Sequence, residues 1–257
     1  MTAFLQGLAG LARLPEASRA RPWQWHHGTG HELRARDALY RLLEDELKAA
    51  IAHPPPGRAM HAVSLGQQAW GELRGLLVPV PDDMLDRRAA AGMWCLRDVL
   101  AHVLLTERRY RIQVDHAAQR TDGDPLWPEV ELSLSERDQS GGILSWLERI
   151  DAQRQCSAQL ASLPDMMLSR PAVWAGYRVD VGFRLLRFAG HLTEHTIQAE
   201  QVLEAAGWRP GESQRVARRI SAARGAHELW TPPGNLALLD RQLTALVAEL
   251  RMRAMPA

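Results

Sequence analysis

Two histidines stand one helical turn apart in the segment GHLTEHT, where they are His191 and His195. Four residues of α-helix turn through about 400°, so the two side chains project from nearly the same face. Imidazoles placed in this way can bind one metal ion, with each nitrogen about 2.0–2.1 Å from it. The chain has ten histidines, so the same spacing also arises by chance. The alternative is one core histidine and one surface histidine.

His102 is the candidate for a third ligand. It lies in LRDVLAHVLLTERRY, beside Val99 and Val103 of an apolar stripe. If that helix neighbours the helix of His191 and His195, the three imidazoles meet across the core. Three histidines leave coordination positions open, which is typical of catalytic rather than structural metal sites. Taken alone, His102 is better explained as a histidine at the edge of the core.

The elements that must position these side chains are helices. Apolar residues recur in steps of three and four, the period of an amphipathic helix. The clearest example contains His191 and His195, and His195 occupies its apolar stripe, where an unpaired polar group costs about 1–3 kcal/mol. We expect helices over 32–52, 64–78, 95–118, 143–163, 180–206, 213–226 and 236–253.

Polar and turn-forming residues mark the ends of these helices. Ser64 with Gln67 three residues later predicts a capping box, and Asn235 is the expected N-cap of the last helix. Residues 1–31 are predicted to form an irregular arm. Residues 121–138 are predicted to form a long crossing loop, and 165–179 contain at most a short extended piece. No strand pattern of useful length occurs, so the predicted class is an all-α antiparallel bundle.

Composition excludes several classes of function. The formal net charge is +1, so no strong field attracts nucleic acid or an anionic membrane. No stretch approaches the roughly 20 apolar residues of a membrane span. The nine tryptophans are dispersed, as expected for core or interface residues rather than a base-stacking platform. The two cysteines form no CxxC pair, and the N-terminus lacks the basic start of a signal peptide, so we expect a cytoplasmic protein.

Two segments resemble the DinB superfamily of DinB/YfiT-like metalloproteins. They are GLLVPVPDDMLDRRAAAGMW followed by LRDVLAHVLLTERRY, and GHLTEHTIQAEQVLEAAGW. The resemblance implies a four-helix bundle with a long crossover over residues 64–208. It leaves 1–63 as an N-terminal arm and helix packed on the bundle, and 209–257 as a C-terminal helical extension. It also implies one divalent metal per chain, either zinc, nickel or iron, held by His102, His191 and His195.

The same resemblance implies a metal-dependent transferase or isomerase that uses a low-molecular-weight thiol. It assigns no catalytic or cofactor-binding residue beyond the metal ligands. The alternative is a non-catalytic module that binds a metal or small ligand, or that forms a homodimer through the leucine stripe of 236–253. A third hypothesis is a bundle whose three histidines bind no metal.

Three further points concern the residues around these histidines, and the chain's small, all-helical character argues against the first. The sequence from His191 to His195 also matches HxxEH, the inverzincin protease signature, in which Glu194 would be the general base. Thiol-histidine sulfoxide synthases have HxxxHxE, whereas Ile197 stands at the last position here, which argues against that activity. Glu107 is expected either to hydrogen-bond a ligand histidine or to pair with Arg111 on the helix surface.

Overall fold

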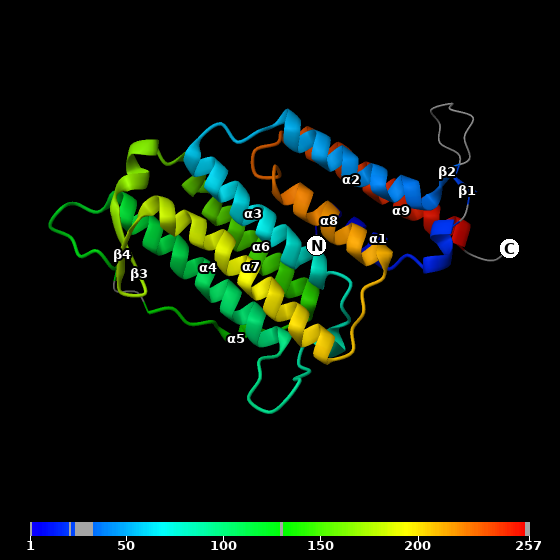
Figure 1. The fold of residues 1–257 in the computed structure, drawn as a ribbon, viewed down its shortest axis with the longest axis horizontal. Coiled ribbons are helices and arrows are strands. Elements are labelled where there is room, and N and C mark those ends of the chain that lie inside the picture. The colour runs from blue at the N-terminus through cyan, green and yellow to red at the C-terminus, as the bar shows by residue number, and fades with distance from the viewer. Residues whose placement is uncertain (1, 21, 24–32, 129–130, 255–257) are drawn as a thin grey trace.

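Four helices form a bundle in the left part of the view in Figure 1. The computed structural model describes residues 2–20, 22–23, 33–128 and 131–254. The expected all-α class is confirmed. For three of the four bundle helices, the boundaries are close to those predicted. The bundle helices are α3 (Arg58–Leu77), α4 (Leu96–Gln119), α6 (Ile143–Ser157) and α7 (Val181–Ala205).

Hydrogen bonds at the helix ends fix the directions of these four helices. Arg97, at the start of α4, donates to the carbonyl oxygen of Gln139, 2.8 Å away and just before α6. Both helices therefore start at the same end of the bundle and run in the same direction. The connection between them must return along the bundle, and it contains the short helix α5 (Glu136–Gln139). This is the long crossover that the sequence predicted.

The start of α7 lies beside the end of α4. The Val181 amide donates to the carbonyl oxygen of Arg170 at 3.1 Å. The Arg170 guanidinium in turn donates to the carbonyl oxygen of Ala117 at 3.1 Å, near the last turn of α4. The two helices that contain the three histidines are consequently antiparallel neighbours.

Four more helices pack beside the bundle, where α8 contacts α3 directly (Figure 1). They are α1 (Ala3–Ala12), α2 (Ala35–Ala52), α8 (Glu212–Gly225) and α9 (Pro233–Ala254). Glycines allow α3 and α8 to approach closely: a Cβ added at Gly71 would lie 2.8 Å from the Cα of Ala222. Gly225 of α8 makes a similarly close approach to the main chain of Gln67.

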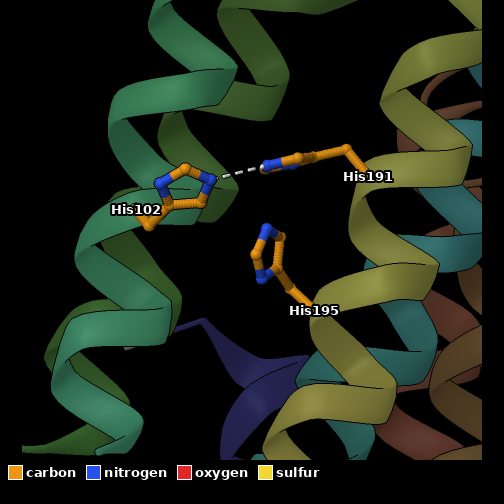
Figure 2. Close-up of side chains that lie close together, drawn as sticks. All are labelled: His102, His191 and His195. Atoms are coloured by element: carbon orange, nitrogen blue, oxygen red, sulfur yellow. Dashed lines mark hydrogen bonds between the residues drawn. The ribbon is translucent and has the colours of Figure 1, made fainter. Parts of the chain in front are cut away.

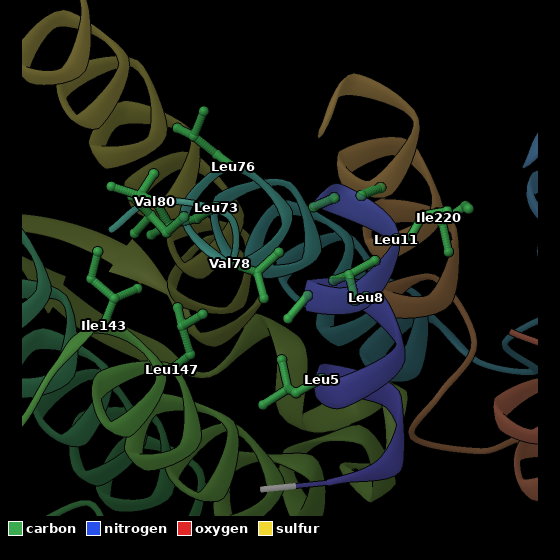
Figure 3. Close-up of a cluster of buried hydrophobic side chains, with 14 of the residues drawn as sticks. Leu5, Leu8, Leu11, Leu73, Leu76, Val78, Val80, Ile143, Leu147 and Ile220 are labelled. Atoms are coloured by element: carbon green, nitrogen blue, oxygen red, sulfur yellow. The ribbon is translucent and has the colours of Figure 1, made fainter. Parts of the chain in front are cut away.

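One hydrophobic core joins the bundle to these outer helices. Leu5 and Leu8 of α1 are fully buried in the same cluster as Leu73 of α3 and Leu147 of α6 (Figure 3). Complete burial of one such side chain contributes about 1.5–3 kcal/mol of stability. The first helix of the chain therefore contributes to the core that holds the bundle.

The remaining elements are short. In the antiparallel hairpin of β3 and β4, Pro171 lies opposite Asp180 and Trp174 opposite Tyr177. Its two-residue turn, Ala175 and Gly176, has positive φ at both positions, 49° and 83°, as expected for a tight hairpin turn. The short elements are β1 (Pro22–Trp23), β2 (Leu33–Arg34), β3 (Pro171–Trp174), β4 (Tyr177–Asp180), η1 (Glu16–Ala20), η2 (Asp82–Met84), η3 (Ala158–Ser162) and η4 (Asp165–Ser169).

The prediction of an irregular arm over 1–31 is wrong for residues 3–12, which form α1. Two glycines in this segment lower its intrinsic helix propensity. In the folded chain they let α9 approach, because Gly7 faces Leu243 and Gly10 faces Val247. Tertiary packing therefore outweighs the local preference. Residues 1, 21 and 24–31 of the predicted arm lie outside the described residues.

Two predicted helix starts are also wrong. The helix expected from Ser64 begins at Arg58, with Gly57 as its N-cap. Ser64 lies inside α3, and its hydroxyl donates to the carbonyl oxygen of Ala226 at 3.0 Å. Asn235 is not an N-cap, since α9 already begins at Pro233. In both cases a local capping pattern occurs within a helix that starts earlier.

The leucine stripe of α9 is used inside the chain. Leu243 and Leu250 are buried in the shared core, and α9 packs on α1. Homodimer formation stays a prediction, but it requires another surface or a rearrangement of this helix. No helix among the described residues combines the length and the apolar character needed to cross a membrane.

Candidate metal centre

The antiparallel pair α4 and α7 brings His102, His191 and His195 together (Figure 2). Each residue offers a ring nitrogen, and these atoms all lie within 4.8 Å of one another. Nε2 of His102 is 3.1 Å from Nε2 of His191. All three candidate ligands predicted from the sequence therefore occupy one site.

The separation of two of these nitrogens, those of His102 and His191, fits a divalent metal. Two nitrogens that each bind the same ion at about 2.0–2.1 Å are about 3–3.4 Å apart when the angle between the two bonds is octahedral or tetrahedral. The 3.1 Å between His102 and His191 falls within this range. His195 completes a set of imidazole donors of the kind that binds zinc, nickel, iron or copper.

Burial favours the neutral form of His102 and His191, which is the form that binds metals. His191 and His195 are 4% and 5% exposed, whereas His102 is half-buried. Burial, with smaller contributions from His195 and His102, lowers the pKa of His191 to about 2. Burial also lowers the pKa of His102, assisted by the neighbouring His195. Both shifts favour rings without the second proton, whose positive charge would oppose metal binding.

Gln198 orients the ring of His195. Its Oε1 lies 2.7 Å from Nδ1 of His195, so Nδ1 carries the proton and Nε2 is left as a metal ligand. Such a second contact fixes the tautomer of a ligand histidine. No motif in the sequence pointed to Gln198. Its position three residues after His195, one turn along the same helix, was the available clue. His191 differs, because its Nδ1 is buried without a hydrogen-bond partner among the described residues.

Trp94 covers one side of the histidines. It lies in the connection before α4, 38% exposed, with its ring nearly parallel to that of His195 at a centroid distance of 6.2 Å. Its ring centroid is also 5.2 Å from that of His102. The sequence analysis placed Trp94 among dispersed core or interface residues and did not connect it with the site.

Glu107 adopts neither of its two expected roles. It is fully buried, and its carboxylate accepts a hydrogen bond from Arg154 of α6 at 2.9 Å. Burial raises the pKa of Glu107, although Arg154 opposes that rise. Arg154 also donates to Gln67 of α3 at 3.0 Å, which ties three bundle helices together. Arg111 instead pairs with Asp115 at 3.2 Å.

Glu194 does not occupy the position of a general base. Its side chain is 65% exposed and lies 3.8 Å from Arg187 in a surface ion pair. The protease interpretation of HxxEH therefore lacks its catalytic carboxylate at this site.

A cleft of about 420 Å³ opens beside the histidines. His102 and His191 form part of its wall, together with Arg184 of α7 and the aromatic rings of Trp127 and Trp174. The β3–β4 hairpin contributes Trp174 and thereby shapes the cleft. A larger cavity of about 760 Å³ lies near the first turns of α3 and α7, and none of the three histidines lines it.

Comparison with known proteins identifies the family. The family model of the DinB superfamily matches residues 65–199, which is more than half of the chain and includes all three histidines. The chain belongs to the DinB superfamily. The resemblance of the two sequence segments is thus confirmed, whereas the assignment of the metal ligands is not decided by this match.

No curated protein matches the chain. Among solved structures, the chain is similar to YfiT from Bacillus subtilis, described as a probable metal-dependent hydrolase with an unusual four-helix bundle topology. The two share 15% identity with a TM-score of 0.46, over 58% of this chain and 87% of YfiT. That description is of YfiT, and at this level of likeness it is not transferred to the present DinB superfamily member.

Proposed function

We propose that His102, His191 and His195 hold one divalent metal ion and that the protein performs metal-dependent chemistry on a small molecule. The observation that carries the proposal is the convergence of three buried or half-buried imidazoles from two helices, with two Nε2 atoms 3.1 Å apart. Three protein ligands leave coordination positions free for a substrate. Zinc, nickel and iron(II) all suit this donor set.

The reaction class that we propose is transfer or isomerisation with a low-molecular-weight thiol. A divalent metal bound here would supply thiolate stabilisation, which raises the fraction of the nucleophilic form at neutral pH. The chain's own residues would orient the reactants: Gln198 holds His195, Trp94 screens one side from water, and the adjacent cleft accommodates a small molecule. The buried Glu107–Arg154 pair would keep α4 and α6 in register beneath the site.

Metal analysis of the purified protein tests the first part of this proposal. We expect about one zinc, nickel or iron per chain in the wild type and less than a tenth of that in His195→Ala. His61→Ala is the matched control, because His61 is exposed and lines the separate cavity near α3. Absence of metal from the wild type, even after incubation with each of the three ions, would overturn the metal-centre proposal.

The thiol reaction is tested separately on metal-loaded protein. Cysteine, glutathione and other small thiols are incubated with a chromogenic electrophile, and turnover is compared between wild type and His195→Ala. Turnover in the wild type that is lost in His195→Ala supports the transferase. A stoichiometric metal without turnover of any thiol would instead favour the non-catalytic metal-binding module.

A further inference from the structure

Arg184 is a buried cation without a carboxylate partner among the described residues. It lies in the first turn of α7, is 1% exposed, and donates from Nη2 to the Gln113 side-chain carbonyl. Its Nε is buried and makes no hydrogen bond. Its guanidinium carbon lies 4.5 Å from the centroid of the Tyr110 ring. The face of the guanidinium is therefore covered by an aromatic ring, while its hydrogen-bonding capacity is only partly used.

The other buried arginines of the described chain behave differently. Each forms an ion pair with at least one acidic side chain, because an unpaired buried charge is costly. Arg184 is the exception, and burial lowers its pKa to about 10, which still leaves it charged at neutral pH. The pairs are Arg74 with Asp151 and Glu228, Arg154 with Glu107, and Arg224 with Glu46 and Asp240.

Arg184 lies in the fold where its charge can meet a ligand. Arg184 lines the same cleft as His102 and His191. It precedes His191 by seven residues, which is two helical turns or about 10 Å along one face of α7. Arg109, which is exposed, adds positive charge to the cleft, and Trp127 and Trp174 supply apolar walls. The cleft thus combines a cationic group, aromatic walls and two of the three histidines.

We propose that Arg184 binds the carboxylate of the small molecule that occupies this cleft. The ligand has a carboxylate at one end, an apolar body against Trp127 and Trp174, and its reacting group near the three histidines. A guanidinium binds a carboxylate through two parallel hydrogen bonds, and one such group balances the single charge of Arg184. The placement of the reacting group rests on the proposed function, but the carboxylate contact does not.

The first experiment needs no metal. Chelator-treated full-length protein is titrated calorimetrically with 4-methylbenzoate and with the neutral isostere 4-methylbenzamide. We expect wild type to bind the benzoate about tenfold or more tightly, the size of one charge-assisted hydrogen bond. Arg184→Gln should abolish this preference. Arg111→Gln is the control, because it removes a guanidinium of α4 that lies outside the cleft. This variant should retain the preference for the benzoate.

Equal affinity of wild type for the two probes would overturn the proposal, as would a preference that survives in Arg184→Gln. Thermal melts report whether that variant folds. If it does not, the wild-type comparison together with Arg184→Lys decides, because lysine keeps the charge but loses the paired hydrogen bonds. Arg184→Lys should keep only part of the preference.

A second arm separates this inference from the metal proposal. Cobalt(II)-loaded protein is titrated with 4-(mercaptomethyl)benzoate and its primary amide while the visible spectrum is recorded. A thiolate-dependent spectral change with a stronger response to the carboxylate supports both proposals. Protein that takes up no cobalt contradicts the metal centre alone, and the first arm still decides the role of Arg184.

Discussion

Nε2 of His102 lies 3.1 Å from Nε2 of His191, and the two rings come from antiparallel helices. In the absence of an ion this distance is a hydrogen bond only when one of the two nitrogens carries a proton. A metal ligand carries none at that atom. His102 and His191 can thus either hydrogen-bond to each other or bind one ion together. Metal binding would replace the single hydrogen bond between α4 and α7 by two coordination bonds to the same ion.

The first prediction concerns the pH dependence of the metal-free protein. His191 has an ordinary pKa of 6.5, and burial lowers it to about 2 in the folded chain. The unfolded chain therefore binds a proton below pH 6.5 that the folded chain does not. Stability is present above pH 6.5 and is lost as the pH falls towards the folded-state pKa. For one histidine the loss is at most about 1.4 kcal/mol per pH unit.

Denaturant unfolding of chelator-treated protein between pH 7.5 and 5 measures this slope. Wild type is compared with His191→Gln. The carboxylates and the remaining histidines are present in both proteins, so the difference in slope reports His191. We expect the free energy of unfolding of the wild type to fall more steeply as the pH is lowered. Identical slopes in the two proteins would show that His191 is not held neutral by burial.

Gln198 should tune metal affinity without being a ligand. Its Oε1 lies 2.7 Å from Nδ1 of His195, and loss of such a contact typically weakens metal binding 10- to 100-fold. We expect this loss in Gln198→Ala and close to wild-type affinity in Gln201→Ala, an exposed position on the same helix. Competition with a chromophoric chelator gives the affinities. Unchanged affinity in Gln198→Ala would mean that His195 is oriented by packing alone.

Trp94 should report the arrival of a metal ion. Its ring stacks over His195 at 6.2 Å, and paramagnetic ions such as nickel(II) and copper(II) quench nearby tryptophan emission. We expect titration with either ion to quench part of the wild-type fluorescence at one equivalent. Most of that change should disappear in Trp94→Phe, while Trp230→Phe, in the connection between α8 and α9, retains it. Equal quenching in the two variants would place the metal elsewhere.

The sequence predicted the helices and the pair of His191 and His195 because both follow from spacing along single helices, whereas His102 joined the pair through the family resemblance. Residues four apart on one helix must share a face, and the stripe containing His195 had to be covered. Arg184 was not singled out, although it belongs to the same helix. Arg184 differs from the other buried arginines because no acidic side chain of a neighbouring helix pairs with it among the described residues. Spacing along one helix does not reveal which residues of another helix will be its partners. The same applies to Glu107, which pairs with Arg154 rather than with its helical neighbour Arg111.

Local patterns failed where packing between distant segments decides the structure. The glycines of residues 3–12 argued against a helix, yet they are the residues that admit Leu243 and Val247. Ser64 has the sequence of a cap but lies where α3 meets the end of α8. Sequence reasoning could detect neither case, because each contact joins segments more than 150 residues apart.

Gly71 provides a direct test of the close packing between α3 and α8. A Cβ at this position would overlap the carbonyl oxygen of Ser221 and lie 2.8 Å from the Cα of Ala222, so backbone rather than a flexible side chain must move. Overpacking of this kind costs about 1–3 kcal/mol, which exceeds the gain of up to about 1 kcal/mol from replacing a helical glycine. Gly71→Ala should therefore lower the free energy of unfolding. Gly190→Ala, on the exposed face of α7 where the added Cβ would meet only the guanidinium of Arg187, should raise it slightly. Denaturant melts of both variants measure the difference, and a stabilised Gly71→Ala protein would mean that α8 is not in backbone contact with α3.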